Sequence, residues 1–207
     1  MTATERGYRK AAMEFAAYGQ NANYPLYGLV EEAGELLEAA ISDDAGHVLG
    51  ELGDCSWMLA AICTEFKISW TEVMSMVDRL GPYDLDAEPD GAKPAEVGAF
   101  LVSIEVSKIA GKVAKFIRKN DGMNPKLAQK FEYTKGGVLE IFNRDLFKRI
   151  VNVARIVIAI AKVLGYAYPI VLSHNIEKLT ERRATGTIAG SGETVEERKA
   201  NAAKETV

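Results

Sequence analysis

Cysteine and histidine are both scarce in this 207-residue chain, which contains two of each. The cysteines, Cys55 and Cys63, lie eight residues apart in what reads as a single helix, too far apart to form a disulfide with each other there. No Cys-x-x-Cys pair is present, so the pattern typical of a structural zinc site is missing. The two cysteines that cannot pair with each other favour the reducing cytoplasm as the setting of this protein.

An excess of positive charge and a long hydrophobic run are also missing. The net charge is -4, and broad nucleic-acid binding needs a basic surface that neutralises phosphates. The first ten residues have no apolar signal core. The most apolar stretch, Ile150 to Leu164, is too short to span a bilayer and contains Asn152, Arg155 and Lys162. We therefore expect neither a nucleic acid nor a membrane as a partner.

Helical periodicity dominates the chain, and no stretch shows the strict alternation of a strand, so the sequence predicts an all-α fold. Pro and Gly punctuation, together with Asp44 and Ser69 as candidate N-caps, divides it into helices. We expect helices at about Thr4–Tyr18, Pro25–Ser42, Ala45–Glu65, Trp70–Leu80, Phe100–Lys119, Asp145–Leu164 and Pro169–Arg183. This pattern predicts a first helical half over residues 1–81, a linker over 82–98, a second helical half over 99–185 and a mobile tail over 186–207.

Two short acidic patterns are the most informative feature. Glu32 and Glu35 are three positions apart, as are Glu51 and Asp54, so on helices each pair shares one face. Two such helices side by side would bring four carboxylates to one place, where like charges disfavour ionisation. Hard divalent cations bound through carboxylate oxygens reverse that cost. The pattern therefore predicts a magnesium site, with Glu31 as an additional acid beside it.

The alternative interpretation of the acids is a solvated helix face. Three observations weigh against it. The second acidic pair lies on the next predicted helix, at the right distance for an antiparallel neighbour. Glu51 and Asp54 lie beside strongly apolar positions, so their face borders the core. Gly34 and Gly53 fall inside the two acidic pairs, where a close approach between helices would require small residues.

A weak internal similarity suggests a duplicated helical hairpin, and the sequence leaves this open. Glu31–Leu36 can be laid on Ile104–Ile109, and Trp57–Phe66 on Arg155–Leu164. In that register Glu51 and Asp54 fall on Arg149 and Asn152, so the second half would have lost its acids.

A basic stripe follows helical spacing in the second half. It consists of Lys108, Lys112, Lys115 and Lys119, with Arg118 beside it. A solvated face is the favoured interpretation, and a phosphate-facing wall opposite the acids is the alternative.

Several segments together resemble a known family. Glu31-Glu32-Ala33-Gly34-Glu35 and Glu51-Leu52-Gly53-Asp54 resemble the signature of the MazG-like, all-alpha nucleoside triphosphate pyrophosphohydrolases. The similarity extends to Tyr8–Ala12, Tyr27–Val30, the Asn-x-x-Lys-Leu-x-x-Arg segment from Asn175 to Arg182, and the Gly-rich Gly186–Glu193. The acidic motifs are its most specific part.

The resemblance implies a MazG-like helical bundle that hydrolyses a nucleoside triphosphate (NTP or dNTP) to the monophosphate and pyrophosphate, a house-cleaning role in nucleotide metabolism. It implies Mg²⁺, with Mn²⁺ as a substitute, held by Glu32, Glu35, Glu51 and Asp54. Glu31 would bind a further ion or orient the attacking water. Lys178 and Arg182 would contact phosphate oxygens, and Asn175 would orient the substrate. The family also implies a homodimer, unless duplication replaces that interface.

The chain departs from the family in spacing, because Asn175 lies some 120 residues after Asp54. Two arrangements stay open. Arg79 would serve a site built from the first half alone, or the second half would supply Lys178 to the acids of the first. Other classes are a di-iron carboxylate protein, which needs Glu-x-x-His pairs that the acidic motifs lack, and a non-catalytic nucleotide- or partner-binding bundle.

Overall fold

The computed structural model describes residues 2–18, 23–85, 91–120 and 138–187. Its regular structure there is entirely helical, which confirms the predicted all-α fold. The helices are α1 (Ala3–Met13), α2 (Tyr24–Ile41), α3 (Ala45–Glu65), α4 (Trp70–Leu80), α5 (Pro94–Lys119), α7 (Val138–Val163) and α8 (Tyr168–Ala184).

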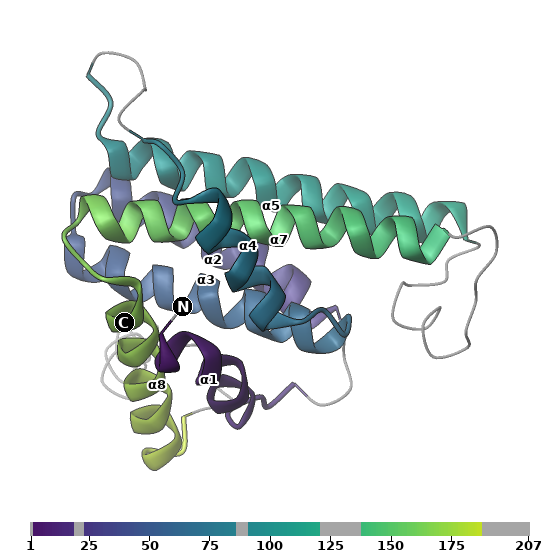
Figure 1. Ribbon diagram of the computed structural model, residues 1–207. Helices are drawn as coiled ribbons and strands as arrows, with labels where there is room; N and C mark the ends of the chain where they lie inside the picture. The colour runs from purple at the N-terminus through teal and green to yellow at the C-terminus, as the bar shows by residue number, and fades with distance from the viewer. Residues whose placement is uncertain (1, 19–22, 86–90, 121–137, 188–207) are drawn as a thin grey trace, which may run out of the picture.

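Four long helices form the centre of the molecule. α2 packs on α3 and on α5, α5 packs on α7, and α7 returns to contact α3. Figure 1 shows α5 and α7 side by side along almost their whole length. Fully buried aliphatic side chains from all four helices fill the space between them, including Leu29, Leu36, Leu52, Leu59, Ile62, Ile109, Ile150, Ile156 and Ile160. Burial of this apolar surface is the main stabilising contribution to the bundle.

The shorter helices cross between the two halves of the sequence. α4 belongs to the first half but packs on α7, and α8 belongs to the second half but packs on α3. α1 lies against α3 and α8 (Figure 1). This exchange places α8 beside the helix that carries Glu51 and Asp54.

Two tryptophans fix α1 in place. The indole N–H of Trp57 on α3 donates to the Ala12 carbonyl at 3.1 Å, and that of Trp70 on α4 donates to the Glu5 carbonyl at 2.8 Å. Both rings are buried, so their N–H groups require partners. α1 is thereby held against the face of the bundle on which α8 lies.

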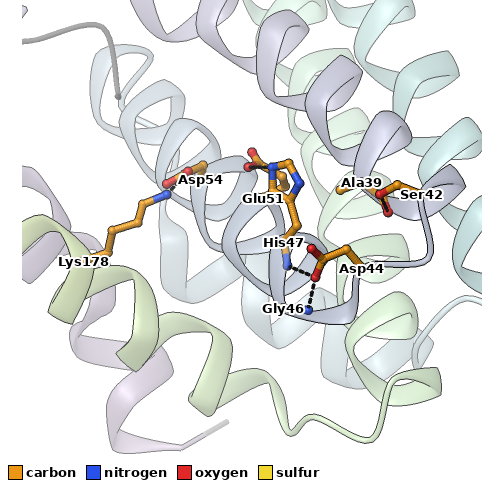
Figure 2. Close-up of polar contacts among 8 residues, drawn as sticks. All are labelled: Ala39, Ser42, Asp44, Gly46, His47, Glu51, Asp54 and Lys178. Atoms are coloured by element: carbon orange, nitrogen blue, oxygen red, sulfur yellow. Dashed lines mark hydrogen bonds and ion pairs between the residues drawn. The ribbon is translucent and has the colours of Figure 1, made fainter. Parts of the chain in front are cut away.

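Local sequence signals explain where α3 and α4 begin. Asp44 caps α3 by accepting the N–H groups of Gly46 and His47, both at 3.0 Å (Figure 2). Ser69 caps α4 by accepting the Glu72 N–H at 3.2 Å. Both caps were expected from the sequence, and each satisfies N–H groups that lack an intrahelical partner.

Three boundaries differ from the prediction. α1 ends at Met13 rather than near Tyr18, and α7 begins at Val138 rather than near Asp145. α5 begins at Pro94, inside the stretch expected to be a linker, because proline suits the first helical turn. The expected tail lies almost wholly in 188–207, outside the described residues.

Among the described residues, no single helix has the length and hydropathy of a membrane span. Ile141–Val163 and Tyr168–Ala184 meet that criterion only as a pair, across a bend of 98°.

Candidate functional site

Three carboxylates converge where α2 packs on α3. One oxygen each from Glu32, Glu35 and Glu51 lies within 4.8 Å of the other two. Glu32 and Glu35 are one turn apart on α2, and Glu51 comes from α3. The two acidic motifs thus meet at one point in space, as the i,i+3 spacing predicts.

Burial and neighbouring carboxylates raise the pKa of Glu32 and of Glu51. Burial, reinforced by the charges of Asp54, Glu51 and Glu35, raises the pKa of Glu32 to about 9. Burial and the charge of Asp54 raise the pKa of Glu51 to about 7. Without a cation, part of this cluster therefore holds protons at neutral pH, and a bound divalent ion would displace them.

Glu51 has one carboxylate oxygen free of protein partners. Its Oε1 lies 3.2 Å from His47 Nε2, one turn earlier on α3 (Figure 2). Its Oε2 is buried and finds no hydrogen-bond partner among the described residues. A buried polar atom without a partner is unusual in proteins, and an ion or a water at this position would satisfy it. With Glu32 and Glu35 beside it, the donor set is the one that hard divalent cations prefer.

Asp54 lies at the edge of this group and faces α8. The Lys178 ammonium forms an ion pair with its Oδ2, and the Asn175 side-chain amide donates to its Oδ1 at 2.9 Å. Figure 2 shows Lys178 extending from α8 toward Asp54. Asp54 is also the largest charge acting on the pKa of both Glu32 and Glu51. It therefore connects the acidic group on α2 and α3 with the basic side chain on α8.

Tyr8 is a site residue to which sequence reasoning assigned no role. Its buried hydroxyl donates to Asn175 Oδ1 at 2.8 Å, which leaves the Asn175 amide N–H to point at Asp54. Burial, with the charges of Tyr168 and Asp54, raises the Tyr8 pKa well above its usual range, so this hydroxyl stays a donor. The only available signal was the similarity of Tyr8–Ala12 to the opening of the family.

The two glycines inside the acidic motifs, Gly34 and Gly53, differ in how closely another helix approaches them. A Cβ added at Gly53 would lie 2.9 Å from Asn175 Cβ, so the close approach of α3 and α8 requires glycine there, as expected. At Gly34 the same expectation is wrong, because an added Cβ would meet no other described atom within 4 Å.

Tyr24 and Arg182 lie at the rim of the acidic group. The Tyr24 pKa is raised by burial and by the charges of Glu32 and Glu31, and it is lowered by Arg182, so all three lie near its hydroxyl. The Tyr24 ring is 45% exposed and stacks on Tyr18 with 5.0 Å between ring centroids. Glu31 itself is exposed and lies outside the group of three. The rim thus combines an accessible aromatic face with a cation.

Arg79 lies on α4, apart from the carboxylates of α2 and α3. It is exposed on α4, where its guanidinium contacts Met76 Sδ at 2.7 Å, and α4 packs on α7. Lys178 and Asn175, in contrast, both contact Asp54. The structure therefore favours the arrangement in which the second half completes a site whose acids come from the first.

Comparison with known protein families identifies a match in the first half of the chain. Residues 11–80 match the family model described as phosphoribosyl-ATP pyrophosphohydrolase (PRA-PH), which covers about a third of the chain and includes α2, α3 and α4. No curated protein and no solved structure matches this chain. The matched segment contains every acid of the site but neither Asn175 nor Lys178. Residues 11–80 are thus a PRA-PH domain, which belongs to the superfamily of MazG-like, all-alpha NTP pyrophosphohydrolases.

Proposed function

We propose that this chain hydrolyses a nucleoside triphosphate, or a derivative that retains the triphosphate, between its α and β phosphates. One water is consumed, one anhydride bond is broken, and the products are the monophosphate and pyrophosphate. The PRA-PH family implies pyrophosphohydrolase activity on a nucleotide-type substrate. The observation that carries the finer proposal is the convergence of Glu32, Glu35 and Glu51, with Glu51 Oε2 buried and unpartnered.

The residues present fit a divalent metal, and the family is typically metal-dependent. Glu32, Glu35 and Glu51 would hold Mg²⁺, with Mn²⁺ as a substitute, and Asp54 would join them from the edge of the group. The bound ion would neutralise phosphate charge and lower the pKa of water. Phosphoryl transfer depends mainly on such positioning and charge neutralisation.

The basic side chains account for binding of the phosphates. Lys178 lies beside Asp54, and Arg182 follows it one turn later on α8. Asn175 keeps Asp54 oriented, since its own amide is fixed by Tyr8. Tyr24, stacked on Tyr18 at the rim, offers an exposed face for a base. In this assignment Glu31 supplies additional negative charge at the rim, where a further ion or the attacking water would bind.

One chain supplies both the acids and Lys178, so the proposed site needs no residue from a second copy. A homodimer therefore stays a prediction from the family and not a requirement of this geometry. A cytoplasmic setting likewise stays a prediction, with both cysteines free and buried.

The test is a panel of canonical and modified nucleoside triphosphates together with phosphoribosyl-ATP, assayed with Mg²⁺ and with EDTA. Pyrophosphate and orthophosphate are detected separately. We expect Mg²⁺-dependent pyrophosphate with the matching monophosphate from at least one substrate. The preferred member of the panel then decides between a general nucleotide and phosphoribosyl-ATP.

Glu35→Gln keeps the shape of the side chain but removes its charge, so we expect the fold to persist and turnover to fall at least about 100-fold. Glu38→Gln is the matched control, one turn further along α2 and outside the group of three carboxylates. Orthophosphate release alone, or full activity in Glu35→Gln, would overturn the proposal. Tight nucleotide binding without turnover on any substrate would instead support a binding bundle.

A further inference from the structure

A second charged site lies on the opposite hairpin, formed by α5 and α7. An open groove of about 710 Å³ runs along α5, and its lining includes Phe100, Ser107, Lys108, Lys112, Lys115 and Arg149. All of these residues come from α5 except Arg149, which comes from α7. The groove shares no lining residue with the acidic site.

The two hairpins end in the same way. α3 and α7 end 98 positions apart, at Glu65 and Val163, and α4 and α8 begin 98 positions apart, at Trp70 and Tyr168. Three backbone hydrogen bonds at the end of α3 repeat at the end of α7 at that spacing. After α3, the N–H groups of Phe66, Lys67 and Ile68 donate to the carbonyls of Ile62, Thr64 and Cys63. After α7, the N–H groups of Leu164, Gly165 and Tyr166 donate to the carbonyls of Ile160, Lys162 and Ala161. Lys67 and Gly165 both have positive φ, 55° and 82°.

The helices of the two hairpins also pack in corresponding pairs. α2 packs on α3 as α5 packs on α7, and α8 lies on α3 as α4 lies on α7. At the spacing of 98, Glu51 corresponds to Arg149. Laying α2 on α5 by their Glu31–Leu36 and Ile104–Ile109 segments pairs Glu35 with Lys108. The basic groove therefore occupies the position on α5 and α7 that the acidic group occupies on α2 and α3.

Two of the three acids correspond to cations, Glu35 to Lys108 and Glu51 to Arg149, whereas Glu32 corresponds to another acid, Glu105. In the second hairpin Glu105 is paired with two cations, Arg149 Nη1 at 2.8 Å and Lys108 Nζ at 2.6 Å. Lys112 pairs with Asp145, whereas Lys115 is exposed and forms no ion pair with any described residue. The four cations Lys108, Lys112, Lys115 and Arg149 therefore outnumber the two acids Glu105 and Asp145. Both acids are paired with cations, so their charges repel a phosphate less.

We propose that this groove binds a phosphorylated small molecule of nucleotide size without a divalent cation. Lysine and arginine donors at the groove bind phosphate oxygens through charge-assisted hydrogen bonds. Phe100, 56% exposed and two turns before Lys108, lies about 12 Å along α5 from that lysine, where it can stack on a base. The volume falls within the range of small-molecule sites.

The test is calorimetric titration of the full chain with ATP in EDTA, where the metal-free acidic group repels the anion. Inorganic pyrophosphate and adenosine are titrated separately. We expect ATP to bind more tightly than pyrophosphate, pyrophosphate to bind detectably, and adenosine to bind weakly or not at all. The affinity for ATP should fall as salt is raised, since the exposed cations are screened.

Lys112→Ala combined with Lys115→Ala should weaken ATP binding at least about tenfold, because two charged donors are lost. Lys162→Ala, an exposed lysine at the end of α7 outside the groove, is the matched control and should leave affinity unchanged. Lys178→Ala should also leave it unchanged. If the double variant unfolds, Lys115→Ala alone serves as the test, because it breaks no ion pair among the described residues. It should still weaken ATP binding, since one charged donor is lost.

Absence of ATP binding up to millimolar concentrations in EDTA would overturn the proposal. So would binding that is lost in Lys178→Ala but kept in the lysine double variant, because the acidic site would then be the receptor. Metal-free binding without any hydrolysis would contradict only the proposed enzymatic function. Hydrolysis without metal-free binding would contradict only the groove.

Discussion

Glu32 and Glu51 hold protons at pH values where an ordinary glutamate is ionised, because burial and neighbouring carboxylates raise their pKa to about 9 and about 7. Between the ordinary value of 4.5 and these values, the folded state binds more protons than the unfolded state. The free energy of unfolding therefore decreases as pH rises through this range. In EDTA we expect the melting temperature to fall by a few degrees from pH 5 to pH 9.

Added Mg²⁺ should reverse this loss, and more strongly at pH 8 than at pH 6, because the metal binds the ionised carboxylates. Glu51→Gln should flatten the pH dependence in EDTA, and Glu38→Gln should leave it unchanged. A melting temperature that rises from pH 5 to pH 9 without metal would contradict the electrostatic account of the cluster.

Tyr8 connects α1 to the site through a single hydroxyl. Tyr8→Phe removes the donor to Asn175 Oδ1 and leaves that buried oxygen without its partner. We expect a loss of about 1–3 kcal/mol in the free energy of unfolding. Because the Asn175 amide would no longer be fixed toward Asp54, we expect kcat/KM to fall about 10–100-fold. Chemical denaturation and steady-state kinetics measure the two effects.

Asn175→Ala provides the comparison for Tyr8→Phe. If Tyr8 acts through Asn175, the two changes together should cost little more activity than Asn175→Ala alone. Additive losses would show that the hydroxyl acts on the site by another route.

At the scale of elements, the two helix ends that repeat at a spacing of 98 carry different residues. Lys67 adopts φ 55° after α3, whereas Gly165 adopts φ 82° after α7. A side chain in this left-handed region costs about 1–2 kcal/mol relative to glycine. We expect Lys67→Gly to raise the melting temperature by about 2–4 °C per kcal/mol gained, and Gly165→Ala to lower it similarly.

Both positions are exposed, so neither change disturbs packing. Differential scanning calorimetry measures the shifts. Equal and opposite shifts are the expected pattern, and a destabilised Lys67→Gly would contradict the shared geometry of the two helix ends.

The helical elements were largely predictable because their signals are local. Asp44 and Ser69 cap helices where the sequence indicates, and Pro25 and Pro169 lie in first turns. The start of α5 was missed because Pro94 and Gly98 read as a linker. Gly98 instead lies inside the helix, where an added Cβ would meet Ile160 at 2.5 Å. That requirement comes from α7, more than sixty residues away, and no local pattern reports it.

The acids of the site were predictable for the same reason, since i,i+3 pairs on adjacent helices need only short-range periodicity. The contacts of Asp54 were not, because Asn175 and Lys178 lie 121 and 124 residues away. Sequence spacing left both Arg79 and Lys178 as candidates. The packing of α8 on α3 and of α4 on α7, which no local pattern reports, distinguishes them.

At the scale of the whole molecule, the exchange of α4 and α8 makes the two halves depend on each other. A fragment of residues 1–81 would expose the faces of α2 and α3 that α5 and α8 cover. It would also lack Asn175 and Lys178. We expect this fragment to show no cooperative thermal unfolding by circular dichroism and no pyrophosphate release.

The control is a chain of residues 1–187, which keeps every described helix and should match the full-length protein in both measurements. A folded and active 1–81 fragment would instead support a self-contained first half in which Arg79 replaces Lys178.

The ion pair between Asp54 and Lys178 also has a consequence for biosynthesis. A ribosome that adds about 5–20 residues per second needs roughly 6–25 s to travel the 124 residues between them. During that time the nascent chain carries the carboxylates without the lysine, and α3 has no α8 to cover it. The proposed site can therefore assemble only after α8 has been translated, so a product truncated before α8 would bear the acidic motifs without a complete site.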